Sequence, residues 1–497
     1  MEEINLQSKA INATKWSSIT EIAAKLISPV TNMILARIIA PEAFGVVATI
    51  TMIISFAEMF TDSGFQKYLV QHEFKDEDEK YKNANVAFWT NFTISILLLS
   101  LIILFSNQLA ALVGNPGLGN VLAIASIQLP LTSFSSIQMA LYRRDFDFRT
   151  LFIVRMISVC IPFVITIPLA LHGLSYWALI IGSLAIQLSN AIILTIKSKW
   201  KPKFFYNMKV LKEMFSFSVW SLIEAISIWL TTWVDAFIIA NALNEYYLGL
   251  YKTSTSMVNT LMAVITSSIV PVLFSTLSRL QEDDTQFNYI FFKFERLVSV
   301  LVFPIGIGVY IYSDLATQIL LGNQWNEASD VIGVWALTSS IMIVFGNLCS
   351  EVYRAKGRPK LSFMAQISHL IILVPACIIS SRYGFWELVY TRAWIRMQFV
   401  LVHFIVMKFA IGISIRKTIR NVLPTAISSI IMGLLGLFLQ KVHKGVMWSL
   451  ISIILCILFY LVILLLFPNI RKEIFLIAKK VIPKGFVRSH KTKCIEK

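Results

Sequence analysis

Apolar runs of about twenty residues recur along this sequence, and they limit its fold more than any other feature. A helix of that length crosses the roughly 30 Å hydrocarbon layer of a membrane. Of the 497 residues, 57% are hydrophobic and 14% are charged, whereas a soluble domain carries about 25% charged residues. Such a chain cannot hide its apolar surface from water. The sequence therefore predicts an all-α polytopic membrane protein.

Fourteen runs are long and apolar enough to be transmembrane helices, with an error of a few residues at each boundary. They lie near residues 15–38, 43–66, 85–106, 119–140, 150–171, 174–197, 213–241, 246–275, 290–313, 329–353, 362–380, 385–408, 419–441 and 446–467. The connections between them are short, which leaves no room for a folded domain outside the membrane. Whatever the protein does, we expect it to do within the bilayer.

The net charge of +16 comes largely from the connections that follow even-numbered runs. These include "KSKWKPKFF", "YRAKGRPK" and "IRKTIR", whereas the intervening connections "HGLS" and "NALNE" contain no Lys or Arg. Cytoplasmic loops carry the excess of Lys and Arg, so this pattern predicts that both termini are cytoplasmic. We assign the basic segments to contacts with anionic lipid and expect no nucleic-acid partner.

An internal repeat divides the chain. "WSSITEIAAKLISPVTNMILARIIAPEAFGVVA" from Trp16 aligns without gaps on "WSLIEAISIWLTTWVDAFIIANALNEYYLGLYK" from Trp220, so that Gly45 matches Gly249 at an offset of 204. Six runs separate the copies, which gives both the same orientation in the membrane. We therefore expect an N-lobe at 1–200, a C-lobe at 201–412, and a last part at 413–497 with two further helices and a basic tail.

Polar side chains form stripes along several of these runs. Placing a basic or Asp side chain at the centre of a lipid-facing helix costs roughly 2.5–3.5 kcal/mol, so the stripes require a polar environment. They predict a hydrated central cavity between the two lobes. The alternative is that the charges form ion pairs that hold the bundle together, as Glu21 and Lys25 could at a spacing of four. The stripes comprise Ser18, Glu21, Lys25, Ser28 and Asn32; Glu224, Ser227, Thr231 and Asp235; Lys252, Ser256, Asn259 and Thr266; and Arg392, Arg396 and His403.

Three short segments, "ATKW" (13–16), "LARIIAPEAFGVVA" (35–48) and "TDSGFQKYLVQ" (61–71), resemble the bacterial Wzx-type polysaccharide exporters. These are flippases of the multidrug/oligosaccharidyl-lipid/polysaccharide exporter superfamily. The resemblance implies two six-helix lobes around a cavity lined by the first, second, seventh and eighth helices. It also implies a monomer in the bacterial inner membrane that is no enzyme and works with polysaccharide polymerase or assembly proteins. Its expected substrate is an undecaprenyl-pyrophosphate-linked repeat unit of O-antigen, capsule or exopolysaccharide, which moves to the outer leaflet by alternating access.

The chemistry of this substrate suggests roles for the polar stripes. Arg offers a planar fork to phosphate oxygens and Lys offers a point charge, so Lys25, Lys252, Arg392 and Arg396 are candidates for the pyrophosphate. The cavity residues that would bind sugar hydroxyls or balance its charge are Glu21, Ser28, Asn32, Glu224, Thr231, Asp235 and Asn259. The family resemblance implies that Arg37 ends the first helix at the outer surface and that Gly45 lets the second helix pack closely. The helical phase of Arg37 agrees, because it lies off the polar stripe.

Transport could be coupled to a proton or sodium gradient, since buried carboxyl groups can take up either cation. The candidates are Glu58, Asp62, Glu224 and Asp235. We expect no metal site and no other cofactor. Two alternatives stay open: an ion-coupled multidrug antiporter, which would favour an acidic and aromatic cavity, and a membrane glycan polymerase or ligase, which would need a larger outer loop.

Overall fold

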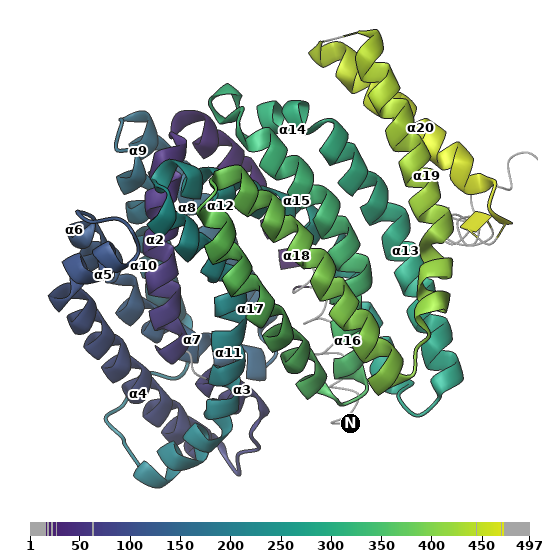
Figure 1. The fold of residues 1–497 in the computed structure, drawn as a ribbon. Coiled ribbons are helices and arrows are strands. Elements are labelled where there is room, and N and C mark those ends of the chain that lie inside the picture. Colours follow the sequence, from purple (N-terminus) through teal and green to yellow (C-terminus); the bar gives the residue numbers. More distant parts are fainter. Residues whose placement is uncertain are drawn as a thin grey trace, which may run out of the picture.

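The computed structural model describes residues 16, 19–20, 23–25, 27–61, 64–443, 445–468 and 470–471, apart from the side chains of 216–221, 224 and 268. Within these residues all regular structure is helical, as predicted (Figure 1). Residues 27–38 form a helix that leads into the first half of the chain. The elements that follow it up to residue 197 are α2 (Pro41–Thr61), α3 (Phe65–Gln71), α4 (Glu77–Leu104), α5 (Ser106–Leu112), α6 (Gly119–Ala125), α7 (Gln128–Arg144), α8 (Phe148–Ile161), η1 (Pro162–Thr166), α9 (Ile167–Leu171) and α10 (Tyr176–Lys197).

The second half is built in the same way from long helices joined by short connections. Its elements are α11 (Met208–Ala242), α12 (Glu245–Arg279), α13 (Asp284–Ile311), α14 (Ser313–Leu320), η2 (Asn323–Trp325), α15 (Ala328–Met342), η3 (Ile343–Asn347), α16 (Leu348–Ala355), α17 (Pro359–Ser381), α18 (Phe385–Val406) and η4 (Met407–Ile411). Two further helices, α19 (Ile415–Val442) and α20 (Val446–Leu465), pack on the side of α13 at the edge of the molecule (Figure 1).

Twelve helices in the described part of the chain are long and apolar enough to cross a membrane, and a bent pair in α12 makes thirteen. The first predicted span, near 15–38, is only partly described, so the expected number of fourteen is not confirmed. The two arms of α12, Glu245–Ser267 and Ile269–Arg279, meet at 45°. Pro271 explains this bend, because it lacks an amide hydrogen and its ring clashes with the carbonyl group four residues earlier.

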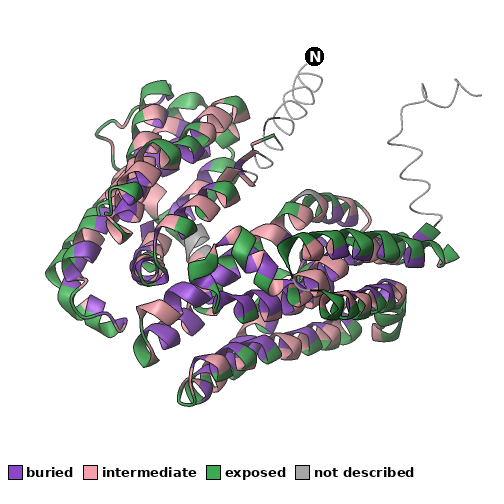
Figure 2. Ribbon diagram, turned by 90° about the horizontal axis from the view of Figure 1, so that it is seen from above, coloured by how far each residue is buried: buried purple, intermediate pink, exposed green. Residues whose placement is uncertain are grey.

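Most helices carry both buried and exposed residues, and exposed residues are frequent on the helices at the outside of the molecule (Figure 2). The span Ala328–Ala355 is the exception, because most of it is buried. Large aliphatic and aromatic side chains are exposed along the outer helices, as expected for a surface that meets lipid. The most extensive core cluster belongs mainly to the second half and includes the fully buried Trp325, Phe291 and Tyr353. The division into lobes at 1–200 and 201–412 stays a prediction.

The two halves approach each other most closely where α2 crosses α12. A Cβ atom on Gly45 would lie 1.8 Å from the carbonyl oxygen of Glu245, and one on Gly249 would lie 1.9 Å from that of Pro41. Both distances are far below van der Waals contact, so only glycine fits at either position. The expectation that Gly45 permits close packing is confirmed. The two contacts also exchange under the offset of the repeat, because 41 + 204 = 245 and 45 + 204 = 249.

A second pair of contacts follows the same symmetry at the same end of the molecule. Gly322, just after α14, packs against the Arg37 side chain, and Gly114, just after α5, packs against the backbone of Ala240 and Asn241. Arg37 corresponds to Asn241 at the offset of 204. Each half therefore supplies a short helix whose following glycine packs against the end of a long helix from the other half. These reciprocal contacts join the halves at this end.

Replacing Gly249 by Ala tests the closeness of this crossing. The new methyl group must displace the Pro41 carbonyl, and such overpacking costs about 1–3 kcal/mol. We expect a lower midpoint of thermal unfolding in detergent. Gly308→Ala in α13 is the matched control, because no atom lies within 4 Å of its added Cβ. Equal unfolding midpoints for the two variants would contradict the tight crossing.

Candidate functional site

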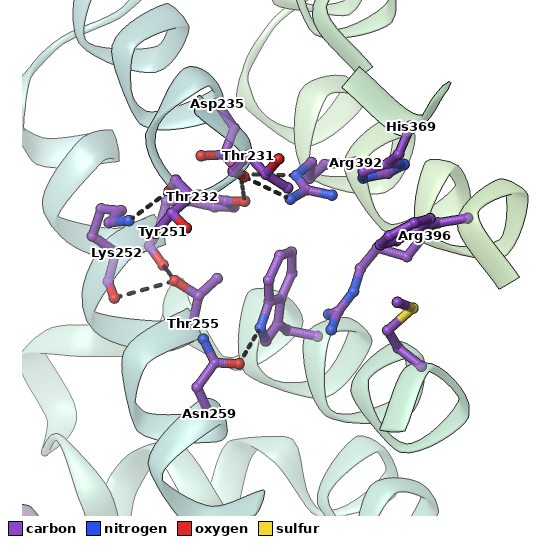
Figure 3. A pocket seen from close by; sticks show the side chains of 13 residues that line it. Thr231, Thr232, Asp235, Tyr251, Lys252, Thr255, Asn259, His369, Arg392 and Arg396 are labelled. Atoms are coloured by element: carbon purple, nitrogen blue, oxygen red, sulfur yellow. Dashed lines mark hydrogen bonds and ion pairs between the residues drawn. The ribbon is translucent and has the colours of Figure 1, made fainter. Parts of the chain in front are cut away.

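A polar cavity of about 240 Å³ lies among α11, α12, α15, α17 and α18 (Figure 3). All five helices belong to the second half of the chain, whereas the sequence analysis expected a cavity between the halves. The lining residues are Thr231, Thr232, Asp235, Tyr251, Lys252, Thr255, Asn259, Trp335, Met342, His369, Arg392, Arg396 and Phe399.

Asp235 is the acidic group of the cavity and is 3% exposed. Its Oδ2 accepts hydrogen bonds from the Arg392 guanidinium (2.8 Å) and the Tyr251 hydroxyl (2.7 Å), and its Oδ1 accepts one from the Ala236 amide (2.7 Å). Both carboxylate oxygens are therefore used within the protein. In this arrangement Asp235 acts as an internal counterion for Arg392.

Arg392 is 6% exposed and reaches Asp235 from the first half of α18. Its NH2 group also lies 3.5 Å from the carbonyl oxygen of Thr231. Its third nitrogen, NH1, is buried and has no hydrogen-bond partner among the described residues. A buried guanidinium nitrogen without a partner is costly, because it has lost its hydration and gained nothing in return. This nitrogen is thus available for an acceptor brought in by a ligand.

Arg396 lies one helical turn after Arg392, and its side chain extends into the cavity (Figure 3). Its guanidinium group sits 4.1 Å from the ring centroid of Trp335. It donates hydrogen bonds to the hydroxyl groups of Thr338 (3.2 Å) and Ser339 (3.0 Å). Trp335 is itself fixed by a 3.1 Å hydrogen bond from its indole to Asn259. Neutral partners thus orient Arg396 and leave its charge in place.

Lys252 contributes the third cation from α12. Its ammonium group donates to the carbonyl oxygen of Thr232 at 3.2 Å and lies 3.9 Å from the ring centroid of Trp233. Three basic residues and one acidic residue line the cavity, so its formal charge is +2 with His369 neutral. Because buried charges are weakly screened, this surplus attracts anions.

Six of the predicted cavity residues line this cavity, and others do not. Thr231, Asp235, Lys252, Asn259, Arg392 and Arg396 line the cavity. Lys25, Ser28 and Asn32, in the first helix, are not among its lining residues. Glu58 accepts a hydrogen bond from Thr132 at 3.3 Å and is also outside this cavity. Glu21, Asp62 and the side chain of Glu224 lie outside the described residues.

Several lining residues were missed by the sequence analysis. Trp335 belongs to α15, a helix with no charged stripe to draw attention to it. The same helix carries Thr338 and Ser339, which do not line the cavity but accept hydrogen bonds from Arg396. Tyr251 directly precedes Lys252, so its position next to a predicted cavity residue was a possible signal. That position does not reveal its hydrogen bond to Asp235, because Asp235 lies on another helix. Arg37 behaves as expected at the end of the first helix, where it is exposed and donates to the carbonyl oxygen of Ile319 at 2.8 Å.

Comparison with known proteins places this architecture among membrane proteins of polysaccharide synthesis. Residues 34–330 match the family described as polysaccharide biosynthesis protein. The succinoglycan biosynthesis transport protein ExoT of Rhizobium meliloti is 27% identical over 66% of this chain and 65% of its own length. The lipopolysaccharide biosynthesis protein WzxC of Escherichia coli is 21% identical over 87% of this chain and 89% of its own length. Among solved structures, the lipid II flippase MurJ in an inward closed conformation has the same fold, with a TM-score of 0.75 and 17% identity over 91% of this chain and 98% of its own.

Replacing Asp235 tests whether this carboxylate acts as the counterion of Arg392. In Asp235→Asn, Arg392 loses its ionic partner inside the protein, which costs about 3–5 kcal/mol for a buried pair. We expect a large drop in the thermal unfolding midpoint, and we expect the double variant Asp235→Asn/Arg392→Gln to regain part of it. Asp314→Asn, at an exposed position, is the control. If Asp235→Asn unfolds at the same temperature as Asp314→Asn, the pair does not hold the cavity together.

Proposed function

This chain belongs to the polysaccharide biosynthesis protein family, and we propose that it is a flippase for an undecaprenyl-pyrophosphate-linked oligosaccharide repeat unit. It would move this repeat unit of O-antigen, capsule or exopolysaccharide from the cytoplasmic to the outer leaflet of the bacterial inner membrane. The observation that carries the proposal is the +2 surplus of a partly open, hydroxyl-lined cavity. A pyrophosphate headgroup has the opposite charge and many acceptor oxygens.

Some residues of the cavity are suited to the pyrophosphate of this headgroup and others to its first sugar. The free nitrogen of Arg392, together with Arg396 and Lys252, would bind phosphate oxygens through charge-assisted hydrogen bonds, about twice as strong as neutral ones. Asn259 and Thr255 would face the first sugar. Asp235 would hold Arg392 in place.

Movement across the membrane requires the cavity to face each side in turn. We place both termini in the cytoplasm, from the distribution of Lys and Arg. The crossing of α2 and α12 at Gly45 and Gly249 then lies at the outer surface and closes that side. Opening would separate these two helices while the rest of each lobe moves as a unit, as in other transporters with parallel repeats.

Coupling to a proton or sodium gradient is a further part of the proposal. Two candidates for binding the coupling ion are described, Glu58 and Asp235. Glu58 lies outside the cavity and accepts a hydrogen bond from the Thr132 hydroxyl. Asp235 would become available to a cation only if Arg392 moved to a bound phosphate. Transport by the reconstituted protein that responds to neither a pH gradient nor a sodium gradient would exclude coupling.

The cavity speaks against the competing antiporter function. A cationic drug would have to enter a site that already contains Lys252, Arg392 and Arg396 against a single carboxylate. Like charges in a weakly screened space repel strongly. The aromatic residues Trp335 and Phe399 alone do not offset this repulsion.

Neutralising Arg396 tests the proposed binding of the headgroup. Loss of a hydrogen bond to a charged group costs about 1.5–3 kcal/mol, so Arg396→Gln should weaken substrate binding roughly 10- to 100-fold. Export of the surface polysaccharide in a deletion strain should fall, while Arg396→Lys should keep part of the activity. Lys441→Gln, at the far end of α19, is the control for the loss of one positive charge. Normal export by Arg396→Gln at normal protein level would overturn this assignment.

The nature of the substrate is tested by deleting the gene and extracting the membrane lipids. We expect a polyprenyl-pyrophosphate-linked glycan to accumulate on the cytoplasmic face, because synthesis continues while transfer stops. The intact gene should restore its normal level and the Arg396→Gln gene should not. Absence of any accumulated lipid-linked glycan, with unchanged surface polysaccharide, would contradict the proposed function.

A further inference from the structure

A second group of basic side chains gathers at the beginning of α19 and shares no residue with the cavity described above. A crevice of about 400 Å³ lies between α13 and α19. Four of its lining side chains are basic, two from each helix. The polar residues that line it are Tyr289, Lys293, Arg296, Lys417, Arg420 and Asn421.

A wider crevice of about 1020 Å³ adjoins the first and shares Arg420 with it. It lies between η4 and α19, and it adds the basic residues Lys408 and Arg416. Six cations therefore line two neighbouring crevices. None of the described residues that line either one is acidic.

The first crevice has a rigid polar base, which distinguishes it from a set of loose surface lysines. Asn421 donates to the carboxylate of Glu295 and to the carbonyl oxygen of Phe292, each at 2.8 Å. Its own side-chain oxygen accepts from Arg296 at 3.1 and 2.8 Å. Glu295 is fully buried. Asn421 is thus held by two acceptors, and it orients the Arg296 guanidinium at the edge of the crevice.

An apolar stripe leads away from these cations along the exposed face of α19. After Arg416 and Arg420, the same face continues with exposed apolar residues at spacings of three and four. These are Leu423, Ile427, Ile430, Leu434 and Leu437. The rise from Arg420 to Ile430 is about 15 Å, half the thickness of the hydrocarbon layer. A headgroup at Arg420 would therefore place acyl chains along this stripe within one leaflet.

We propose that these two crevices bind the headgroup of a membrane phospholipid that carries two phosphate groups. Basic pockets between transmembrane helices on the cytoplasmic side suit such headgroups. Two phosphates joined by a short linker match two crevices on either side of Arg420, whereas a pyrophosphate is a single compact group. Free phosphate would leave the apolar stripe unused. The inference does not depend on which substrate the protein carries.

The positive-inside rule accounts for basic residues near this surface, but it requires neither a shared crevice nor a fixed guanidinium. It also predicts no preference between one anionic lipid and another. A lipid at this site would connect α19 to α13 and η4. It would thereby hold the two last helices against the second half of the chain.

Native mass spectrometry of the purified full-length protein tests the site. The protein is incubated with cardiolipin, phosphatidylglycerol or phosphatidylethanolamine, and the lipid that stays bound after delipidation is counted. We expect cardiolipin to be retained most. One Lys or Arg near anionic lipid contributes about 1 kcal/mol, so Arg420→Gln should lower cardiolipin retention about five-fold. Lys441→Gln, on the same helix at its other end, should leave it unchanged.

Three results would overturn the proposal: equal cardiolipin retention by Arg420→Gln and Lys441→Gln, equal retention of phosphatidylethanolamine, or displacement of the lipid by excess inorganic phosphate. Loss of polyprenyl-pyrophosphate retention in Arg420→Gln, with normal retention in Arg396→Gln, would assign the site to substrate and likewise overturn it. If Arg420→Gln does not fold, Arg416→Gln/Lys417→Gln removes two cations from the same crevices. Arg396→Gln should bind cardiolipin normally, which separates this inference from the proposed transport function.

Discussion

The imbalance of charge in the cavity of the second half governs the rest of the account. Asp235 forms a 2.8 Å ion pair with Arg392, whereas the hydrogen-bond partners of Arg396 and Lys252 are neutral, which leaves two positive charges in excess of one carboxylate. Cations within a membrane-spanning bundle are costly, and membrane proteins keep such groups mainly where they act on a ligand. We therefore propose that an anion completes this site.

The close crossing of α2 and α12 lies near this site along the chain, because α12 carries both Gly249 and the cavity residue Lys252. Gly45 and Gly249 each face the backbone of the other helix, and the two contacts exchange under the repeat of 204 residues. At these two positions the helix backbones meet without an intervening side chain. Beside them, Phe44 and Ala48 of α2 pack against the core cluster that includes Leu248 and Tyr251 of α12, so the crossing closes tightly. The internal repeat thus appears in the structure as a reciprocal contact.

Much of the fold follows from local sequence, whereas the site does not. Apolar length predicted the all-helical membrane fold and the approximate bounds of most helices, and the family resemblance implied the close packing at Gly45. Helical periodicity selected Asp235, Lys252, Arg392 and Arg396, since a polar stripe is a local property. It did not show that Asp235 pairs with Arg392, 157 residues away, because that depends on how α11 packs against α17 and α18. For the same reason, periodicity could not show that α11, α12, α15, α17 and α18 together form one cavity. The cavity expected between the two lobes stays a prediction.

A structure of the purified protein with a short-chain polyprenyl pyrophosphate that carries its first sugar tests the central claim most directly. The account predicts the pyrophosphate in the cavity of the second half, with its oxygens within hydrogen-bonding distance of Arg392 and Arg396 and near Lys252. Binding of the headgroup elsewhere, with Arg396 still bound only to Thr338 and Ser339, would contradict the account.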